Sequence, residues 1–326
     1  MRTILTILFS AGAFAAIAQR PFAHEGAIHK DSNAFVNWAV QGTITRGYQD
    51  ISNTSLGYTT VGDGSNATGK AGENGVVSLG DGGSAVLLFQ KAVMNGPGYD
   101  FAVFENGFPV AGDTSFFLEL AFVEVSSDGQ RYVRFPAVSE TGTTVQKGNG
   151  DGMDPRKLTN LAGNYVLFYG TPFDLEQLKD SAGLDVNRIT HIRLVDVVGS
   201  LNTQYGTKDS RGVMINDPWP TPFGSSGFDL DAVGVIHQDE TTGVHEVPKD
   251  GGIYSHTFYR SGEDVRLTNL EGFSVIKCTD VSGKEICMQP VRGQELTISS
   301  GLFREGVYFI TLSEEKRTCT FKIMVQ

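Results

Sequence analysis

Several acidic residues of this chain occupy strand positions where an apolar core residue is expected. Glu105 ends an aromatic, alternating stretch that reads Y-D-F-A-V-F-E. Asp196 is in register with the apolar residues of the stretch from Ile189 to Val198, and Asp231 shares the parity of two valines that follow it. Carboxylates that come together in a core repel one another unless a cation neutralises them. We therefore expect Glu105, Asp196 and Asp231 to form one cluster at a sheet edge that requires a cation.

The sequence leaves two ways to neutralise such a cluster. An arginine, either Arg134 or Arg193, would form a buried ion pair with one of the acids. A hard metal ion would instead take carboxylate and amide oxygens as ligands, and Ca²⁺ fits such a set best. The calcium hypothesis predicts the following ligands: Glu105, Asn106, Asp196, Asp229 and Asp231.

A second segment, Gly148 to Pro155, alternates Asn, Asp and Gly. Short oxygen side chains and glycines of this kind bend the backbone around Ca²⁺ in known loops. The segment lacks the EF-hand spacing and its closing Glu, and the same residues dominate ordinary Asx turns. A metal loop and a plain turn both remain open here.

The long stretch from Gly199 to Gly227 has no periodicity, which is typical of an ordered functional loop in a compact domain. Prolines on both sides of Trp219 would hold its ring in place at low entropic cost. We predict that this loop carries the ligand surface, although large aromatics also serve as latches that cover the end of a sandwich. The candidate ligand-binding residues are Tyr205, Arg211, Asp217, Trp219 and Phe223.

Strands must position these side chains, because the chain has 40 glycines, many β-branched and aromatic runs, and little helical periodicity. The sequence predicts an all-β fold: a jelly-roll-like β-sandwich body over residues 19–244 and a small C-terminal β-sandwich over residues 245–326. A single long strand is expected from Phe116 to Ser126. Glu119 and Glu124 have opposite parities in it, so at least one should face solvent. The best helical candidate is a short one, from Thr171 to Leu178, with Asp174 as its N-cap.

Residues 1–18 have the features of a removable signal peptide, with Arg2 before a short apolar run and small residues before the cleavage point. No other stretch has the roughly 18 apolar residues of a membrane-spanning helix. The formal net charge of the chain is -11. An acidic surface disfavours nucleic acid and suits divalent cations. The sequence therefore predicts an exported protein without a membrane-spanning segment or a nucleic-acid partner.

The cysteines and histidines do not form a catalytic or zinc pattern. Cys278 and Cys287 flank a turn-like segment, so a cross-strand disulfide would leave Cys319 unpaired. No nucleophile or metal-protease motif accompanies His191, which we interpret as a histidine on a strand face. Paired acids such as Glu105 with Asp231 would suit a glycoside hydrolase, but no acid/base separation is visible. We predict no catalytic residues, and a binding protein rather than an enzyme.

Five motifs together resemble a family of exported bacterial cell-surface proteins. They are D-F-A-V-F-E-N-G-F (100–108), E-L-A-F-V-E-V-S-S-D-G (119–129), G-T-P-F-D-L (170–175), I-T-H-I-R-L-V-D-V-V-G (189–199) and D-P-W-P-T-P-F with G-F-D-L-D-A-V-G-V-I (217–236). Some members resemble surface proteins that capture vitamin B12 and related corrinoids alongside outer-membrane uptake systems. The resemblance implies a small-molecule ligand and a TonB-dependent outer-membrane receptor as partner, but it supplies no corrinoid-binding residue.

The C-terminal segment is similar to the type IX secretion sorting domain of Bacteroidota. The similarity lies in V-I-K-C-T-D-V-S-G-K-E-I (275–286), in G-V-Y-F-I (306–310) and in the closing T-F-K-I-M-V-Q (320–326). It implies recognition by the type IX secretion machinery and a location on the outer face of the outer membrane or outside the cell. Two functions stay open from the sequence: capture of a corrinoid for uptake, and glycan binding or adhesion by a calcium-stabilised carbohydrate-binding module.

Overall fold

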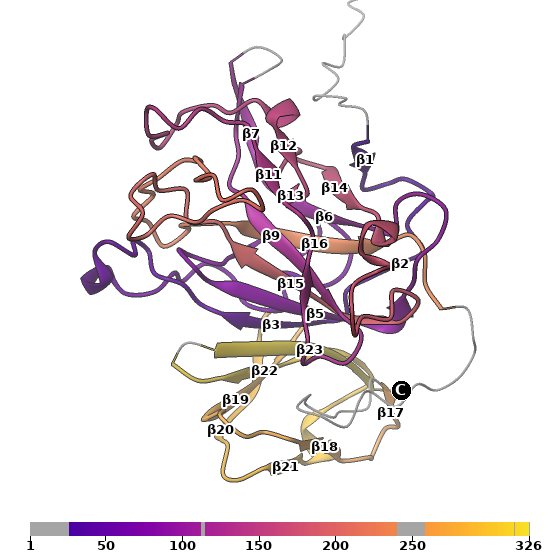
Figure 1. The fold of residues 1–326 in the computed structure, drawn as a ribbon. Helices are drawn as coiled ribbons and strands as arrows, with labels where there is room; N and C mark the ends of the chain where they lie inside the picture. Colours follow the sequence, from indigo (N-terminus) through magenta and orange to yellow (C-terminus); the bar gives the residue numbers. More distant parts are fainter. Residues whose placement is uncertain (1–25, 112–114, 240–257, 316, 326) are drawn as a thin grey trace, which may run out of the picture.

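The computed structural model describes residues 26–111, 115–239, 258–315 and 317–325 (Figure 1). The predicted signal peptide and the predicted domain boundary after residue 244 lie outside these ranges. Within them the chain consists of strands, turns and four single-turn 3-10 helices. The prediction of an all-β sandwich is confirmed.

One sheet of the sandwich forms around β6 and β16, which are buried along their whole length. All of its strand pairs are antiparallel. In spatial order the strands are β1 (Ile28–His29), β14 (Tyr169–Phe173), β6 (Phe101–Glu105), β16 (Asp229–Val235) and β2 (Asn37–Trp38), and β4 (Val77–Ser78) pairs with β16 outside this path.

The second sheet extends from the body into the C-terminal part of the chain. Its body strands, in spatial order, are β10 (Val133–Arg134), β9 (Ala121–Ser126), β15 (Ile189–Asp196), β5 (Ser84–Val93) and β3 (Gln41–Thr45), with β13 (Leu161–Ala162) beside β9. It continues through β23 (Arg317–Val325), β22 (Gly306–Ser313), β19 (Val275–Asp280) and β20 (Glu285–Pro290), and β17 (Phe258–Tyr259) pairs with β23 in parallel.

Short elements complete the fold. Three two-stranded sheets are β7 (Phe108–Ala111) with β8 (Ser115–Phe117), β11 (Val138–Ser139) with β12 (Leu158–Thr159), and β18 (Val265–Thr268) with β21 (Glu295–Ile298). The 3-10 helices are η1 (Thr54–Leu56), η2 (Pro155–Lys157), η3 (Leu175–Leu178) and η4 (Ser300–Leu302).

The main core lies between the two sheets of the body. Alternate residues of β6, including Phe101 and Val103, meet alternate residues of β15, including Ile192 and Leu194. Asp196 continues that inward parity of β15 and is 2% exposed, as the sequence pattern predicts. A separate cluster around Phe122, Leu118 and Leu161 packs on the outer side of β9.

The expected single strand from Phe116 to Ser126 is wrong, because β8 ends at Phe117 and β9 begins at Ala121. The interruption has a specific partner: the Leu120 backbone N–H donates to the Asp217 carboxylate at 3.1 Å, not to a neighbouring strand. The parity argument fails with it. Glu119 and Glu124 are both buried, so neither is the solvent-facing acid that we expected.

The predicted helix from Thr171 to Leu178 is wrong in its first half, because Tyr169–Phe173 is strand β14. Only Leu175–Leu178 turns, as a 3-10 helix. The predicted cap is confirmed, since the Asp174 carboxylate accepts from the Glu176 backbone N–H at 2.9 Å.

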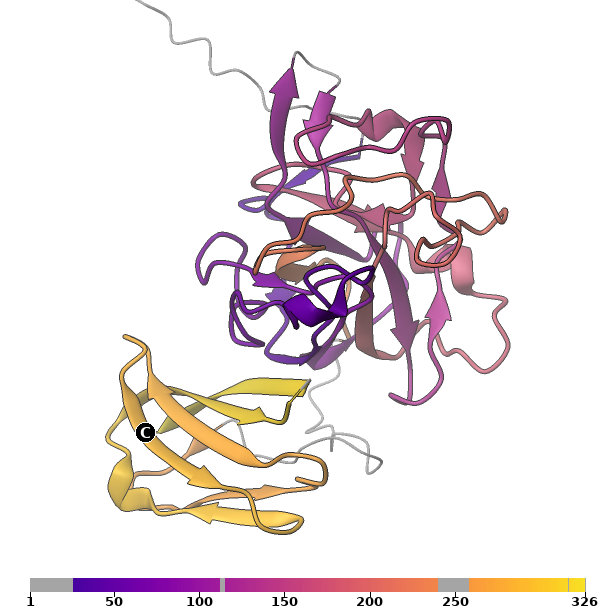
Figure 2. The same cartoon turned by 90° about the vertical axis from the view of Figure 1, so that its left-hand side faces the viewer.

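The strands from β17 to β23 pack around a core of their own, in which Ile276, Ile310 and Ile323 are fully buried. Cys278 and Cys287 are paired residues on β19 and β20 and form a disulfide, while Cys319 is a free, buried thiol. We call residues 258–325 the C-terminal module. Figure 2 shows it on one side of the body.

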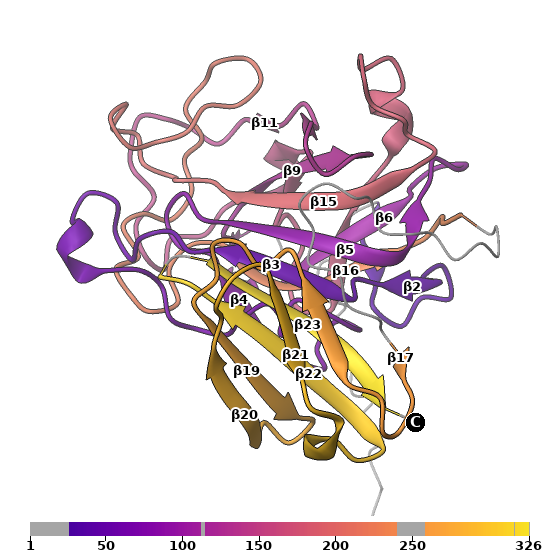
Figure 3. The ribbon, with the colours of Figure 1, turned by 90° about the horizontal axis from the view of Figure 1, so that it is seen from below.

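Body and module share a strand pair. Five residues of β23, Arg317 to Phe321, pair antiparallel with β3, from Thr45 to Gln41. Figures 1 and 3 show β23 beside β3 at this junction. The sheet therefore runs without a break from β10 in the body to β20 in the module.

Candidate functional site

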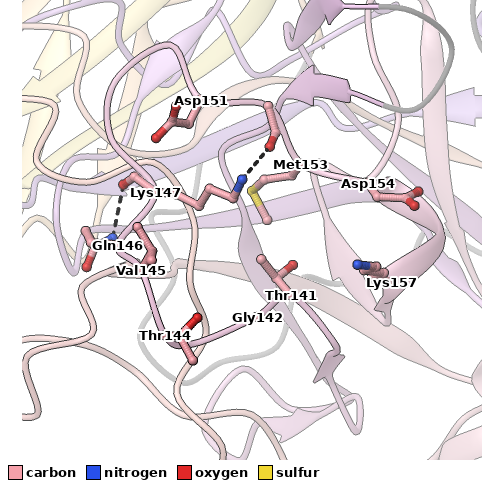
Figure 4. Close-up of a pocket in the computed structure, with 11 residues that line it drawn as sticks. Thr141, Gly142, Thr144, Val145, Gln146, Lys147, Asp151, Met153, Asp154 and Lys157 are labelled. Carbon is pink, nitrogen blue, oxygen red and sulfur yellow. Dashed lines mark hydrogen bonds between the residues drawn. The ribbon is translucent and has the colours of Figure 1, made fainter.

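A polar cleft of about 590 Å³ opens in the body between the segment that follows β11 and the turn that precedes η2 (Figure 4). Its walls carry hydroxyl, amide, ammonium and carboxylate groups and few apolar side chains. We call it the polar cleft; its lining includes Thr141, Thr144, Gln146, Lys147, Asp151, Asp154 and Lys157.

Asn216, from the long loop after β15, holds one wall of this cleft. Its side chain is fully buried. Its Nδ2 donates to the carbonyls of Gly142 at 2.7 Å and Val145 at 2.8 Å, and its Oδ1 accepts from the Lys147 backbone N–H at 2.9 Å. Gln146 fastens the same wall, because its Oε1 accepts from the Leu201 backbone N–H at 2.7 Å. The loop thus fixes the shape of the polar cleft through the backbone.

The opposite wall belongs to the Asn/Asp/Gly segment for which a metal loop and a plain turn were both open. The Asp151 carboxylate accepts from the Gly148 backbone N–H at 2.8 Å. Asp154 caps η2 and forms an ion pair with Arg156 at 2.7 Å. Both acids therefore have the contacts of turn and cap residues, which agrees with the plain-turn interpretation.

The charges of the polar cleft suit binding better than acid catalysis. A hydrogen bond from Arg156 lowers the pKa of Asp154, whereas a general acid needs a raised pKa. The Lys147 Nζ donates to the Gly152 carbonyl at 3.0 Å, across the cleft wall drawn in Figure 4. These groups offer fixed donors and acceptors to a polar ligand.

The structure brings together three of the five predicted ligand-binding residues. Trp219 is half-buried and stacks on Tyr205, with ring centroids 6.1 Å apart. The Trp219 backbone N–H donates to the Lys147 carbonyl at 2.8 Å, so the backbone of Trp219 lies next to a lining residue of the polar cleft. Asp217 is buried behind them, turned away from solvent.

The other two predicted ligand-binding residues stand apart from the Trp219 ring. Phe223 is 50% exposed. Arg211 is engaged with Asp209 at 3.2 Å and Glu140 at 3.8 Å. All five residues lie on the predicted loop, but none of them lines the polar cleft.

A second, much smaller space lies behind Trp219, and its lining is acidic. Asp81, Glu119, Asp196 and Asp217 all line it, and each is less than 8% exposed. It leaves about 10 Å³ for the centre of a water molecule, which is room for one water molecule or one ion. We call it the acidic cavity.

Backbone and indole N–H groups hold three of the four acids in place. Asp196 accepts from the backbone N–H groups of Gly82 at 3.0 Å and Phe228 at 2.8 Å. Asp81 accepts from the Ile51 backbone N–H at 2.8 Å and from the Trp219 Nε1 at 3.0 Å. The Asp217 carboxylate accepts from the Leu120 backbone N–H at 3.1 Å. The carboxylate of Glu119 accepts no hydrogen bond from any described residue.

Burial is the main cause of the raised pKa values in this cavity, and neighbouring acids add to it. Burial, followed by the charge of Asp81, raises the pKa of Asp196 to about 8. Burial and then the charge of Asp196 raise the pKa of Asp217 well above its usual range. The pKa of Glu119 is raised in the same way, with Asp229 and Glu105 as the next contributors.

The predicted metal ligands divide into separate groups. Glu105 accepts from the Gly107 backbone N–H at 2.7 Å, and burial followed by the charge of Asp229 raises its pKa well above its usual range. Asp229 accepts from Ser78 and from Asn106, the latter at 3.3 Å. These residues form a hydrogen-bonded group next to the acidic cavity, and Asp196 alone of the five lines that cavity.

Asp231 does not share the inward face of the valines after it, so its predicted placement is wrong. A β-bulge between Leu230 and Ala232 shifts the register. Leu230 and Val233 both belong to the main core, and the Asp231 carboxylate accepts from the Gly72 backbone N–H at 2.9 Å. A bulge adds one residue and reverses the alternation beyond it.

The arginine alternative for the acidic cluster is also wrong. Arg134 and Arg193 both bind Glu124, at 2.8 Å and 2.5 Å, from the strands on either side of β9. Among the described residues, however, no three His, Cys, Asp or Glu side chains are arranged so that they could already hold a metal ion. The causes that shift the pKa values of the four cavity acids are burial, hydrogen bonds and neighbouring acids, and no basic residue is among them.

Sequence reasoning missed Asp81, Glu119 and Asn216. Asp81 lies in the Gly-rich stretch that we interpreted as turns, and Glu119 in a stretch that we expected to continue a strand. The only sequence signal for Asn216 is its place beside Asp217 on the aperiodic loop.

Comparison with protein-family models and with curated protein sequences finds no match. Among solved structures, the BSP domain of a biofilm-associated protein is similar at 11% identity, over 90% of this chain and 53% of that one, with a TM-score of 0.20. A β-glucuronidase from Ruminococcus gnavus is similar at 11% identity, over 94% of this chain and 46% of that one, with a TM-score of 0.18. This chain spans about half of each structure. Likenesses at these TM-scores carry no argument about its function.

No helix among the described residues is long and apolar enough to cross a membrane. Fold and site together define an all-β sandwich protein with a polar, ligand-sized cleft and a buried acidic cavity.

Proposed function

We propose that this protein is an exported binding protein of the cell surface that captures a small polar ligand in the polar cleft. The observation that carries the proposal is the cleft itself. Its volume of about 590 Å³ falls in the range of small-molecule sites, roughly 300–1,000 Å³. Buried side chains such as Asn216 fix one of its walls before any ligand arrives, which reduces the entropy lost on binding.

The lining favours a carbohydrate over a corrinoid as the ligand. Exposed side chains such as Thr144 and Lys157 offer hydroxyl and ammonium groups that can pair with the hydroxyls of a sugar. Capture of a corrinoid for a TonB-dependent receptor is the competing proposal, and the motif resemblance alone supports it.

Export and surface attachment belong to the same proposal. The N-terminal signal pattern and the likeness of the C-terminal segment to a type IX sorting domain support them. A surface location places the cleft where it can meet ligands before they reach an outer-membrane receptor.

Isothermal titration of the mature chain, residues 19–326, tests the proposal. The titrants are cyanocobalamin and a panel of neutral and acidic mono- and oligosaccharides, each up to about 1 mM. We expect saturable binding of at least one saccharide. Binding of cyanocobalamin alone would replace the carbohydrate with a corrinoid. Absence of binding by every titrant would reject ligand capture of either class.

A further inference from the structure

The acidic cavity shows three features that buried acids with a purely structural role do not need. Four carboxylates from four separate segments line a space that one ion would fill. Buried like charges at close range are costly unless a cation neutralises them. Lys30 lowers the pKa of Asp231, which lies outside the cavity.

The second observation is the unpartnered carboxylate of Glu119. It is 7% exposed and lines the cavity, yet it accepts no hydrogen bond from a described residue. A buried polar group normally has a hydrogen-bond partner, because a group that leaves water without one loses its hydration and gains nothing in return. A ligand in the cavity would provide that partner.

The walls of the cavity also leave no room for side chains at two glycines. A Cβ at Gly199 would lie 1.8 Å from the Asp217 Oδ1, and a Cβ at Gly227 would lie 2.7 Å from the Asp196 Oδ1. Backbone therefore closes directly on the carboxylates and brings polar backbone groups close to the space between them.

From these observations we propose that the acidic cavity is a Ca²⁺ site whose side-chain ligands are Asp81, Glu119, Asp196 and Asp217. The carboxylates supply hard oxygens, and Ca²⁺ completes its six to eight ligands with backbone carbonyls and water. Among the described residues these carboxylates do not form a ready-made metal cage, so Ca²⁺ binding would include a rearrangement of their side chains. The proposal is independent of the ligand in the polar cleft.

Terbium luminescence tests this site directly, because Tb³⁺ replaces Ca²⁺ at oxygen sites and emits when a nearby tryptophan is excited. Trp219 lines the acidic cavity, and Trp38 packs elsewhere, against Phe35 and Phe104. After dialysis of the mature chain against EGTA, we expect saturable, tryptophan-sensitised Tb³⁺ emission that Ca²⁺ displaces. Replacement of the indole in Trp219→Phe should remove the emission.

Glu119→Gln is the decisive variant, and Asp231→Asn is its matched control. Both remove one buried charge, but only Glu119 lines the cavity. We expect Glu119→Gln to weaken Ca²⁺ binding at least tenfold, and Asp231→Asn to change it less than twofold. In EGTA, Glu119→Gln should melt no lower than the wild type, because it loses a repulsion and no hydrogen bond.

Thermal unfolding of the wild type provides a measurement that needs no variant. If 10 mM Ca²⁺ is about 100 times the Kd, it should raise the melting temperature by about 5–10 °C relative to EGTA. A melting temperature that does not respond to Ca²⁺, together with no displaceable Tb³⁺ emission, overturns the proposal. Equal Ca²⁺ affinities of Glu119→Gln and the wild type overturn it as well.

Discussion

Asp231 and Glu124 show two ways in which the body holds a buried carboxylate. Glu124 has two arginines, and both ion pairs are formed across paired strands. Asp231 has the Gly72 backbone N–H and a more distant lysine, and burial raises its pKa to about 6. The buried charge of Asp231 therefore costs the fold stability near neutral pH.

Asp231→Asn should stabilise the protein at pH 7, and the gain should vanish in acid. The folded pKa of about 6 exceeds the unfolded value of roughly 3.9. The protonated acid thus favours folding below pH 4, and this contribution is lost as the pH rises through 6. The neutral amide avoids that loss. We expect about 1–3 kcal/mol at pH 7, measured by urea unfolding between pH 4.5 and 8 in EGTA.

The other acids titrate in both proteins, so the difference between variant and wild type isolates Asp231. A difference in unfolding free energy that stays constant from pH 4.5 to 8 would show that the charge of Asp231 is not what the substitution changes.

At the scale of single residues, strand parity predicted part of the site. It placed Asp196 correctly in the core, because β15 has no irregularity over its last six residues. It failed for Asp231 because a bulge lies beside it, and for Glu119 because the strand stops at Phe117. Both failures come from backbone irregularities that long-range contacts impose, and alternation along one strand does not contain that information.

At the scale of elements, the loop from Gly199 to Gly227 links the two candidate sites. Asn216 binds the wall of the polar cleft, and the next residue, Asp217, lines the acidic cavity. The Asp217 carboxylate also accepts from the Leu120 backbone N–H, at the interruption between β8 and β9. The sequence predicted that this loop is functional, and the structure shows that its polar residues do more of the positioning than its aromatic ones.

Asn216→Ala should destabilise the protein by about 2–4 kcal/mol, because several buried polar groups lose their partner. Those groups are the carbonyls of Gly142 and Val145 and the backbone N–H of Lys147. We expect faster amide hydrogen exchange in residues 141–147, measured by mass spectrometry.

Asn202→Ala is the control for that substitution. Asn202 belongs to the same loop but is exposed, and its side chain accepts only from the Gln204 backbone N–H. It should cost less than about 1 kcal/mol. If both variants lose the same stability, Asn216 does not organise the cleft wall.

At the scale of the whole molecule, the junction of β3 with β23 makes the C-terminal module an extension of the body's sheet. The composition and turn pattern predicted two β units, but a pairing between residues more than 270 positions apart leaves no local signal. The module has its own core, so the body does not need it for burial. The body needs the module only to cover the edge of β3.

Removal of the module should therefore leave a folded body in which β3 is an exposed edge strand. A chain of residues 19–244 exposes the N–H and C=O groups of β3, and exposed edge strands pair with other chains. We expect a lower melting temperature and concentration-dependent association, measured by light scattering. A peptide with the sequence of β23 should suppress the association. A truncated body that stays monomeric and has the same melting temperature as the full chain would contradict this prediction.

The central claim is that the polar cleft is the ligand site, and blocking it tests that claim most directly. A Cβ at Gly142 meets no atom within 4 Å, so Gly142→Trp should fill the cleft without disturbing the fold. Ser210→Trp places the same ring on an exposed turn outside it. The measurement is the affinity of both variants for the titrant that binds the wild type. We predict at least a tenfold loss for Gly142→Trp and less than a twofold change for Ser210→Trp; wild-type affinity in Gly142→Trp would contradict the claim.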